Sequence, residues 1–285
     1  MTFLILSLLF YLLQNFGNKE FNRRSKDISF KEKSLIQNGV CVLIAYFVML
    51  LAGGGKIMSL PLMLMAVLFG ICYLLTIFLL LRSFDGGTLG TSTLLCNLGM
   101  FISAMYGVIR FNDKFTFRIA VAMVCMIVAV ILCNAENKMV NKKSFCLALL
   151  SGVMNGAVAS VKREAIALTE TDPKNFLFWG FFFSGIIVVA VSLFNAKEIK
   201  KGINKKCVLL FSVFGTCAGV GTACANLFQM KALEKGLSSA IVYPFTAGFL
   251  VVSLWLVSLL VYKEVRLKIT NVLAVLLCVT AIALM

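Results

Sequence analysis

Apolar stretches of roughly membrane-spanning length recur along the whole chain. A helix that crosses a hydrocarbon core of about 30 Å needs about 20 largely apolar residues. With so much of the 285 residues in such stretches, too little chain remains for a soluble domain. Ten segments approach or exceed this length, and short charged stretches separate them: 3–18, 35–52, 59–81, 88–109, 117–134, 144–161, 175–194, 207–229, 237–260 and 268–285.

The composition excludes a water-soluble globule. Apolar residues make up 61% of the chain, charged residues only 14%, and there are 25 Phe. Soluble domains average about 45–50% apolar and about 25% charged residues. Inside a bilayer every backbone polar group must be bonded internally, which leaves helices or closed barrels. Because the apolar runs are continuous and lack the alternation of barrel strands, we predict an all-α integral membrane bundle.

The charge balance points to a membrane and not to nucleic acid. The chain has 27 Lys plus Arg against 12 Asp plus Glu, a net charge of +15, and no histidine. Such a charge on a soluble protein suggests nucleic acid, but too few polar residues are present here to form a solvated basic face. We expect the lipid bilayer and a small-molecule substrate as partners, and no nucleic acid. Since histidine is the commonest metal ligand and general base, we expect no metal, no cofactor and no catalytic residues.

The ten cysteines lie almost entirely within apolar runs. No CxxC pair occurs, and the closest spacings are seven and eight residues, which gives no support for a tetrahedral zinc site. We interpret these cysteines as reduced thiols that pack as small apolar side chains.

The two halves of the chain share a pattern. A shift of 151 residues superposes 82–133 on 233–284 without a gap and aligns Asp113 with Glu264. Each half then holds five spans, and an odd number gives the halves opposite orientations in the membrane. We therefore predict ten transmembrane helices in two inverted-topology five-helix repeats. The predicted repeats are 1–137 and 138–285.

One stretch near the C-terminus carries a family resemblance. It reads QMKALEKGLSSAIVYPF over 229–245, and an apolar span, Tyr262, Lys263, Glu264 and a closing apolar helix follow. This order resembles the drug/metabolite transporter superfamily, in its ten-helix form with two EamA-like halves. The family usually has glycine at the position of Lys263 and often has proline at that of Thr93. The resemblance implies secondary transport of metabolites, amino acids, nucleotide sugars or drugs by alternating access, with a cavity between the halves.

Amide side chains inside the apolar spans are candidates for lining that cavity. They are costly in a membrane unless they pair with one another or face a wet cavity. The alternative for each is an interhelical hydrogen bond, which contributes about 0.6 kcal/mol on average. The candidates are Gln14, Asn15, Asn18, Asn97, Asn155, Asn226 and Gln229.

Tyr243 and Pro244 form a further candidate pair. Proline removes a helix donor and kinks the span, which exposes backbone carbonyls beside the phenol of Tyr243. We predict Tyr243 as a substrate contact and Pro244 as a hinge.

Asp113 and Glu264 precede the last span of each half, where a carboxylate complements the positive end of the helix dipole. We interpret both as helix caps. Lys162 and Arg163 are interpreted as a snorkelling helix end, with a place in the cavity as the alternative.

The distribution of carboxylates bears on the substrate. No Asp or Glu lies in the middle of any predicted span, which disfavours a proton-coupled site for cations. Because Lys19, Lys162, Arg163 and Lys231 lie near polar helix ends, we expect a neutral, zwitterionic or anionic metabolite such as an amino acid, sugar or nucleotide-type solute. The alternative within the superfamily is a multidrug or cation exporter. A membrane-embedded enzyme or a scaffold is a more remote alternative, because no paired aspartates or nucleophile with a base is evident.

Two arguments about orientation disagree. The loops on one side hold 18 Lys and Arg and those on the other side hold 9. The positive-inside rule then places both termini outside, whereas the resemblance places both inside. We favour the second arrangement, with both termini on the cytoplasmic side of a bacterial plasma membrane. The substrate, the coupling ion, the direction of transport and the oligomeric state stay open.

Overall fold

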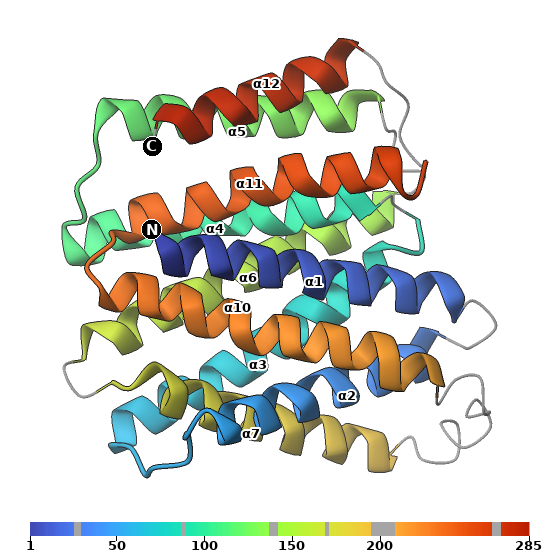
Figure 1. The fold of residues 1–285 in the computed structure, drawn as a ribbon, viewed down its shortest axis with the longest axis vertical. Helices are drawn as coiled ribbons and strands as arrows, with labels where there is room; N and C mark the ends of the chain where they lie inside the picture. The colour runs from blue at the N-terminus through green and yellow to red at the C-terminus, as the bar shows by residue number, and fades with distance from the viewer. Residues whose placement is uncertain are drawn as a thin grey trace.

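The structure is a computed structural model, and it describes residues 1–25, 30–86, 89–136, 142–168, 171–194, 209–263 and 269–284. All the regular secondary structure in the described chain is helical, with no strand. A short π-helix, η1, leads directly into α10. The elements in Figure 1 are α1 Thr2–Arg24, α2 Phe30–Leu51, α3 Leu60–Ser83, α4 Leu89–Phe111, α5 Phe117–Glu136, α6 Lys142–Ala167, α7 Pro173–Phe194, η1 Phe211–Gly215, α10 Thr216–Glu234, α11 Ser239–Leu260 and α12 Ile269–Leu284.

These helices have the character expected of an integral membrane protein. Each apolar segment predicted from the sequence coincides with one of them, to within a few residues at the ends. Six helices in the described residues are long and apolar enough to cross a membrane by length and composition: Ser34–Leu51, Leu60–Ser83, Lys142–Ala167, Pro173–Phe194, Phe211–Glu234 and Ser239–Leu260.

Outward-facing side chains agree with a lipid environment. On α3, Leu64, Leu68, Ile71 and Leu75 are all exposed. Their spacing of four, three and four residues places them on one face of the helix. A continuous stripe of exposed large aliphatic side chains is unfavourable in water but matches hydrocarbon.

The first helix is longer than its apolar run. The sequence predicts a span over 3–18, but α1 continues to Arg24 and buries Asn18 and Glu20. The Glu20 carboxylate accepts hydrogen bonds from Arg23 and Arg24, each at 2.9 Å and one turn further on. Asn18 accepts a hydrogen bond of 2.9 Å from Gln37 of α2. Because each of these polar groups has a partner, the helix can carry them into the bundle.

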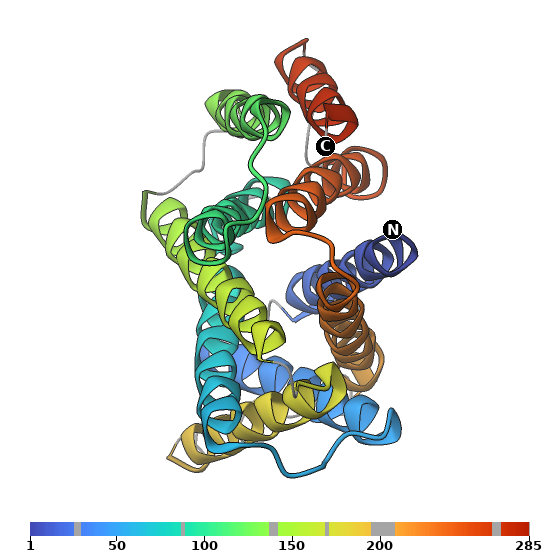
Figure 2. The ribbon, with the colours of Figure 1, turned by 90° about the vertical axis from the view of Figure 1, so that its left-hand side faces the viewer.

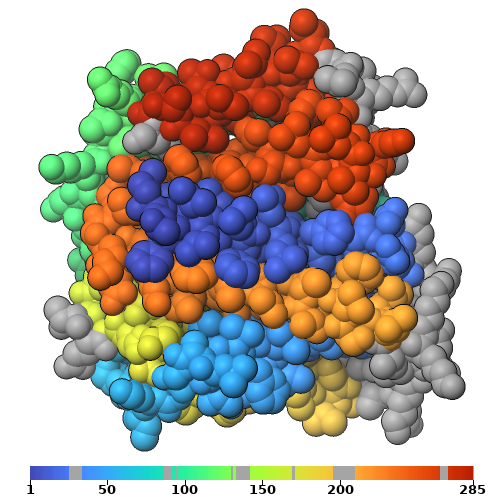
Figure 3. All heavy atoms as spheres, in the orientation of Figure 1, coloured from blue at the N-terminus to red at the C-terminus, as the bar shows by residue number. Residues whose placement is uncertain are grey.

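The bundle consists of two walls joined at both ends, as Figure 2 shows from nearly along the helices. The first, which we call the α6 wall, contains α3, α4 and α6. The second, the α1 wall, contains α1, α10 and α11. The pair α5 and α12 lies at one end of the bundle, and the pair α2 and α7 lies at the other. Figure 3 shows α1 on the outer face between α10 and α11.

The directions of the helices also follow a simple pattern. Successive helices alternate in direction across the bundle, and the two chain ends lie at the same edge of it (Figure 1). Both features are expected if every helix crosses the same membrane layer and the chain turns back after each helix.

Glycines set the closest approach within the α6 wall. A methyl group on Gly99 of α4 would overlap the carbonyl of Gly152 of α6, and one on Gly156 would lie 2.5 Å from the Gly99 oxygen. Gly152 and Gly156, four residues apart on α6, therefore form a packing seam with α4, in which the absence of side chains lets the backbones touch.

Candidate functional site

A buried lysine joins two helices from opposite walls of the bundle. Lys162 of α6 is 2% exposed. Its Nζ donates a hydrogen bond of 2.9 Å to Asn226 Oδ1 and another to Gln229 Oε1, both on α10. Tyr11 of α1 donates to the same Gln229 oxygen at 3.0 Å. We call these four residues the Lys162 cluster; it joins the α6 wall to the α1 wall.

The sequence of α10 explains the orientation of the amides. Asn226 and Gln229 are three residues apart, so they lie on one face of the helix. The Asn226 amide nitrogen donates to the Thr222 carbonyl at 2.9 Å, which turns its oxygen towards Lys162. The Gln229 amide nitrogen is buried and has no hydrogen-bond partner among the described residues. The cluster thus contains one polar group that is not satisfied in this conformation.

All the partners of Lys162 are neutral. Other buried and half-buried carboxylates pair with arginines: Glu20 with Arg23 and Arg24, Asp113 with Arg163, and Glu164 with Arg110. Among the described residues no carboxylate forms an ion pair with Lys162. An ammonium group in a low-dielectric interior without a counter-charge is strongly destabilising.

Further polar contacts cross between the walls on either side of this cluster. Tyr73 of α3 donates to Thr222 of α10 at 3.0 Å. Tyr243 of α11 donates to the Ala159 carbonyl of α6 at 2.6 Å, one turn before Lys162. We call the Lys162 cluster together with these two contacts, Tyr73 with Thr222 and Tyr243 with Ala159, the polar row. Each wall contributes both donors and acceptors to it.

An ion pair closes one end of this row. Arg163 Nη2 lies 3.0 Å from Asp113 Oδ1, and both side chains are largely buried. The other Asp113 oxygen accepts from the Ser239 backbone N–H at 2.8 Å and from the Ser239 hydroxyl. Asp113, which follows α4, thus binds α6 of one wall and the start of α11 in the other.

Comparisons with known proteins identify the fold and no more. No family model matches this sequence, and no curated protein matches it either. A solved structure described only as "Crystal structure of protein" is similar to the chain with a TM-score of 0.73 and 8% sequence identity. The match covers 100% of this chain and 98% of that one. At this identity the similarity concerns the whole arrangement of helices and carries no information on substrate.

Three of the predicted cavity residues come together in the polar row, namely Asn226, Gln229 and Tyr243. The other candidates lie apart from it. Asn155 donates to the Cys96 carbonyl at 3.3 Å, within the α4–α6 seam, and Asn97 is buried on α4.

The candidates on α1 also lie outside the Lys162 cluster. Asn15 donates to the Tyr11 carbonyl of its own helix at 2.8 Å, and Asn18 bonds to α2 as described above. The half-buried Gln14 lies where α1 crosses Gly221 of α10, and its backbone nitrogen would be 2.6 Å from a methyl group on that glycine.

The helix-cap prediction is changed in one respect. Asp113 does cap a helix, but the helix is α11 and not the following α5, whose own start is bonded by the Thr116 hydroxyl at 3.4 Å. The prediction for α5 considered only sequence neighbours, and the fold brings the start of α11 closer. Glu264 lies outside the described residues. Pro244 lies in the second turn of α11, which continues through it.

The sequence predicts neither Lys162 nor Tyr11 among the candidate site residues. It favours a snorkelling helix end for Lys162, with a place in the cavity as the alternative, and the structure buries this side chain inside the bundle. One available signal is that Lys162 follows Asn155 by seven residues, two turns along the same face of α6. No comparable signal distinguishes Tyr11 from the other aromatic residues of α1.

Within the described residues, no group of acidic, cysteine or histidine side chains could hold a metal ion.

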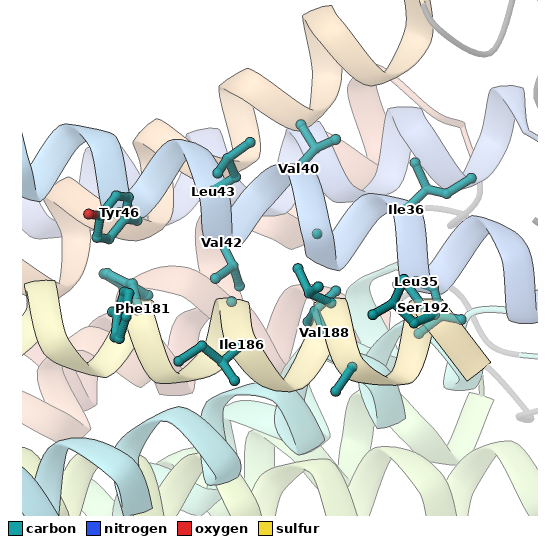
Figure 4. Close-up of a pocket in the computed structure, with 16 residues that line it drawn as sticks. Leu35, Ile36, Val40, Val42, Leu43, Tyr46, Phe181, Ile186, Val188 and Ser192 are labelled. Atoms are coloured by element: carbon teal, nitrogen blue, oxygen red, sulfur yellow. The ribbon is translucent and has the colours of Figure 1, made fainter. Parts of the chain in front are cut away.

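A groove of about 940 Å³ lies apart from the polar row, between α2 and α7 (Figure 4). Its lining is almost wholly apolar, and Leu43, Ile186 and Val189 of that lining are exposed on the outer surface. Such a surface matches lipid chains and offers nothing to orient a polar solute.

Proposed function

We propose that this protein is a secondary transporter, or permease, of the drug/metabolite transporter type, which moves a small polar metabolite by alternating access. The observation that carries the proposal is the polar row that crosses between two walls of an otherwise apolar bundle. Hydrogen bonds between the walls are replaceable by hydrogen bonds to a bound solute. A solute that replaces them from one side, and is released on the other, would be transported.

An internal repeat supports this proposal. Asn112 and Lys263 are the non-glycine residues of the described chain with left-handed backbone, at φ 51° and 53°. They are 151 residues apart, which is the shift that aligns the two halves of the sequence. The left-handed region favours glycine, and glycine is what the family usually has at the position of Lys263. The two halves therefore share an uncommon backbone conformation at the same place.

The helix packing supports the same repeat. α1 packs along α10 as α6 packs along α3, and α2 contacts α10 as α7 contacts α3. The pairs α2–α7, α4–α11 and α5–α12 are in contact, as a two-fold axis between five-helix halves requires. In this arrangement each wall combines two helices of one half with the first helix of the other. We propose that all ten helices cross the membrane, and that the walls, not the sequence halves, move as units.

Solute counterflow tests the proposed function. Purified protein in sealed liposomes, preloaded with one unlabelled solute at a time, is given the labelled solute outside; the panel is serine, glutamate, glucose, UDP-glucose and tetraphenylphosphonium. We expect protein-dependent accumulation of a polar metabolite. Gln229→Leu should reduce the rate at least tenfold, because it removes the shared acceptor of Lys162 and Tyr11. Thr280→Val, which removes an exposed hydroxyl on α12, should leave the rate within twofold.

Two results would contradict the proposal. Accumulation of none of these solutes above the level of protein-free liposomes would reject transport of this class. Accumulation of tetraphenylphosphonium alone would favour the cation exporter.

A further inference from the structure

We propose that Lys162 recognises the solute through an anionic group, a carboxylate or a phosphate, which it binds between α6 and α10. The transported metabolite is then an organic anion, or a zwitterion whose anionic end enters first. This inference rests on the proposed transport function and adds the chemical class of the substrate.

The first argument is the missing counter-charge. Buried charges in proteins are paired or coordinated, because an unpaired one costs several kcal/mol in desolvation. Among the described residues Lys162 contacts two amide oxygens and no carboxylate, while Arg163, the next residue, has Asp113 at 3.0 Å. A solute anion would supply the charge that the described chain does not.

The second argument is the set of donors around the ammonium group. Lys162 has three N–H donors, and two are directed at Asn226 and Gln229. Within the part of the chain that the structure describes, the buried Gln229 amide nitrogen has no acceptor, and the Tyr11 hydroxyl is bonded to the oxygen of the same amide. An anion placed beside Lys162 would accept from the ammonium group and from the unpaired amide together. The site therefore presents an excess of donors, which suits an acceptor-only group.

A comparison with the second buried lysine sharpens this argument. Lys19 of α1 is 8% exposed, and its Nζ lies 5.8 Å from the ring centre of Phe84 and 5.7 Å from that of Tyr262. Aromatic faces stabilise a cation by their quadrupole. Lys162 has no such ring among the described contacts, so its charge is the less compensated of the two.

The third argument is the position of Lys162 between the walls. Lys162 belongs to the α6 wall, whereas Tyr11, Asn226 and Gln229 belong to the α1 wall. When the walls separate, Lys162 must lose its neutral acceptors. An anion entering the opened site would replace them, so anion binding and separation of the walls stabilise each other.

Thermal stability of the purified protein in detergent tests the inference. Sodium succinate and sodium phosphate are the anionic probes, succinamide is the neutral analogue of succinate, and sodium chloride keeps the ionic strength constant. A ligand that binds only the folded state raises the melting temperature, by about 3 °C at ten times its Kd. We expect such a shift with succinate or phosphate and none with succinamide. A larger shift with succinate would indicate a carboxylate substrate, and a larger shift with phosphate would indicate a phosphate substrate.

Variants assign the shift to Lys162. Lys162→Met should abolish the anion-induced shift, and Lys162→Arg should retain part of it. Lys56→Met, at an exposed position outside the cluster, should retain all of it. If Lys162→Met does not fold, the comparison of succinate with succinamide on the wild-type protein decides alone.

Several results would overturn the inference: equal shifts with succinate and succinamide, no shift with either anion, or an undiminished shift in Lys162→Met. Counterflow separates this failure from that of the transport proposal. A neutral solute transported equally by wild type and Lys162→Met would refute anion recognition and leave transport standing. No counterflow of any solute by the wild-type protein would refute the transport proposal itself.

Discussion

The seam between α4 and α6 differs from the seam between α1 and α11, although the proposed repeat relates one pair to the other. α4 and α6 form the most extensive helix contact in the described chain, whereas α1 and α11 touch over a short length near Leu4 and Val242. A perfectly symmetric molecule would have two equal seams. The difference indicates a conformation in which one side of the polar row is tightly closed and the other is loosely closed.

The glycines explain why the seams differ. Gly99, Gly152 and Gly156 all lie in the α4–α6 seam, where backbone meets backbone. On the other side, Gly17 of α1 faces Ala218 of α10, and Gly248 of α11 faces Met126 of α5. Neither glycine therefore lies in the contact between α1 and α11. Two similarly folded halves can therefore form seams of unequal closeness when their small residues face different neighbours.

The largest expected effect comes from blocking the tight seam. A methyl group on Gly152 would lie 2.6 Å from the Leu95 carbonyl oxygen, so Gly152→Ala forces α4 and α6 apart. We expect a loss of about 3 kcal/mol in the free energy of unfolding, as for an overpacked core. Gly185→Ala is the matched control, because its added methyl would lie 3.8 Å from Val42, an ordinary contact. A melting temperature of Gly152→Ala equal to that of Gly185→Ala would show that the seam is not close-packed.

The ion pair at the end of the polar row gives the next effect. Asp113→Ala removes the partner of Arg163 and the cap of α11, and we expect a loss of about 2 kcal/mol. The loss should be smaller in high salt only if water reaches the pair. Asp172→Ala is the matched comparison, since Asp172 also caps a helix by accepting from the Lys174 backbone N–H at 3.0 Å, but its ion pair with Lys174 is 4.0 Å long and exposed. We expect a loss of about 1 kcal/mol there, mostly from the cap. Chemical denaturation in detergent measures both; equal losses would mean that Asp113 does not join α11 to α6.

A smaller effect is expected from the hydrogen bond between α11 and α6. Tyr243→Phe removes the hydrogen bond to the Ala159 carbonyl, which contributes about 1 kcal/mol. Because this bond holds α11 against α6, its loss should favour separation of the walls and increase hydrogen exchange at the start of α11. Tyr46→Phe is the control, since the Tyr46 hydroxyl makes no hydrogen bond to any residue that the structure describes. Unchanged exchange in Tyr243→Phe would show that this bond does not hold the walls together.

The smallest effect concerns the repeat itself. Lys263 has φ 53°, a conformation that costs a non-glycine residue about 1–2 kcal/mol. Lys263→Gly should therefore raise stability by up to about 1 kcal/mol, after the entropic cost of glycine is subtracted. Lys235→Gly, at a residue with φ −79°, should lower stability slightly. A destabilised Lys263→Gly would contradict the left-handed conformation at this position and weaken the proposed repeat.

Much of the fold was predictable from the sequence alone. The ten apolar segments coincide with helices because a bilayer leaves a continuous apolar run few other options. Asn226, Gln229 and Tyr243 were also predictable as site candidates, because polar groups in such runs need partners. Their partners were not predictable, since hydrogen bonds between helices depend on which faces meet.

The sequence by itself determined that this chain is a helical membrane protein, where its helices begin and end to within a few residues, and that its halves share a pattern. These properties follow from local composition and from the thickness of the hydrocarbon core. Only the tertiary structure decided that α1 and α6 lie in opposite walls, that Lys162 points inwards, and that Asp113 caps α11. Each of these depends on contacts between residues far apart in the chain, and helix packing alone brings those residues together.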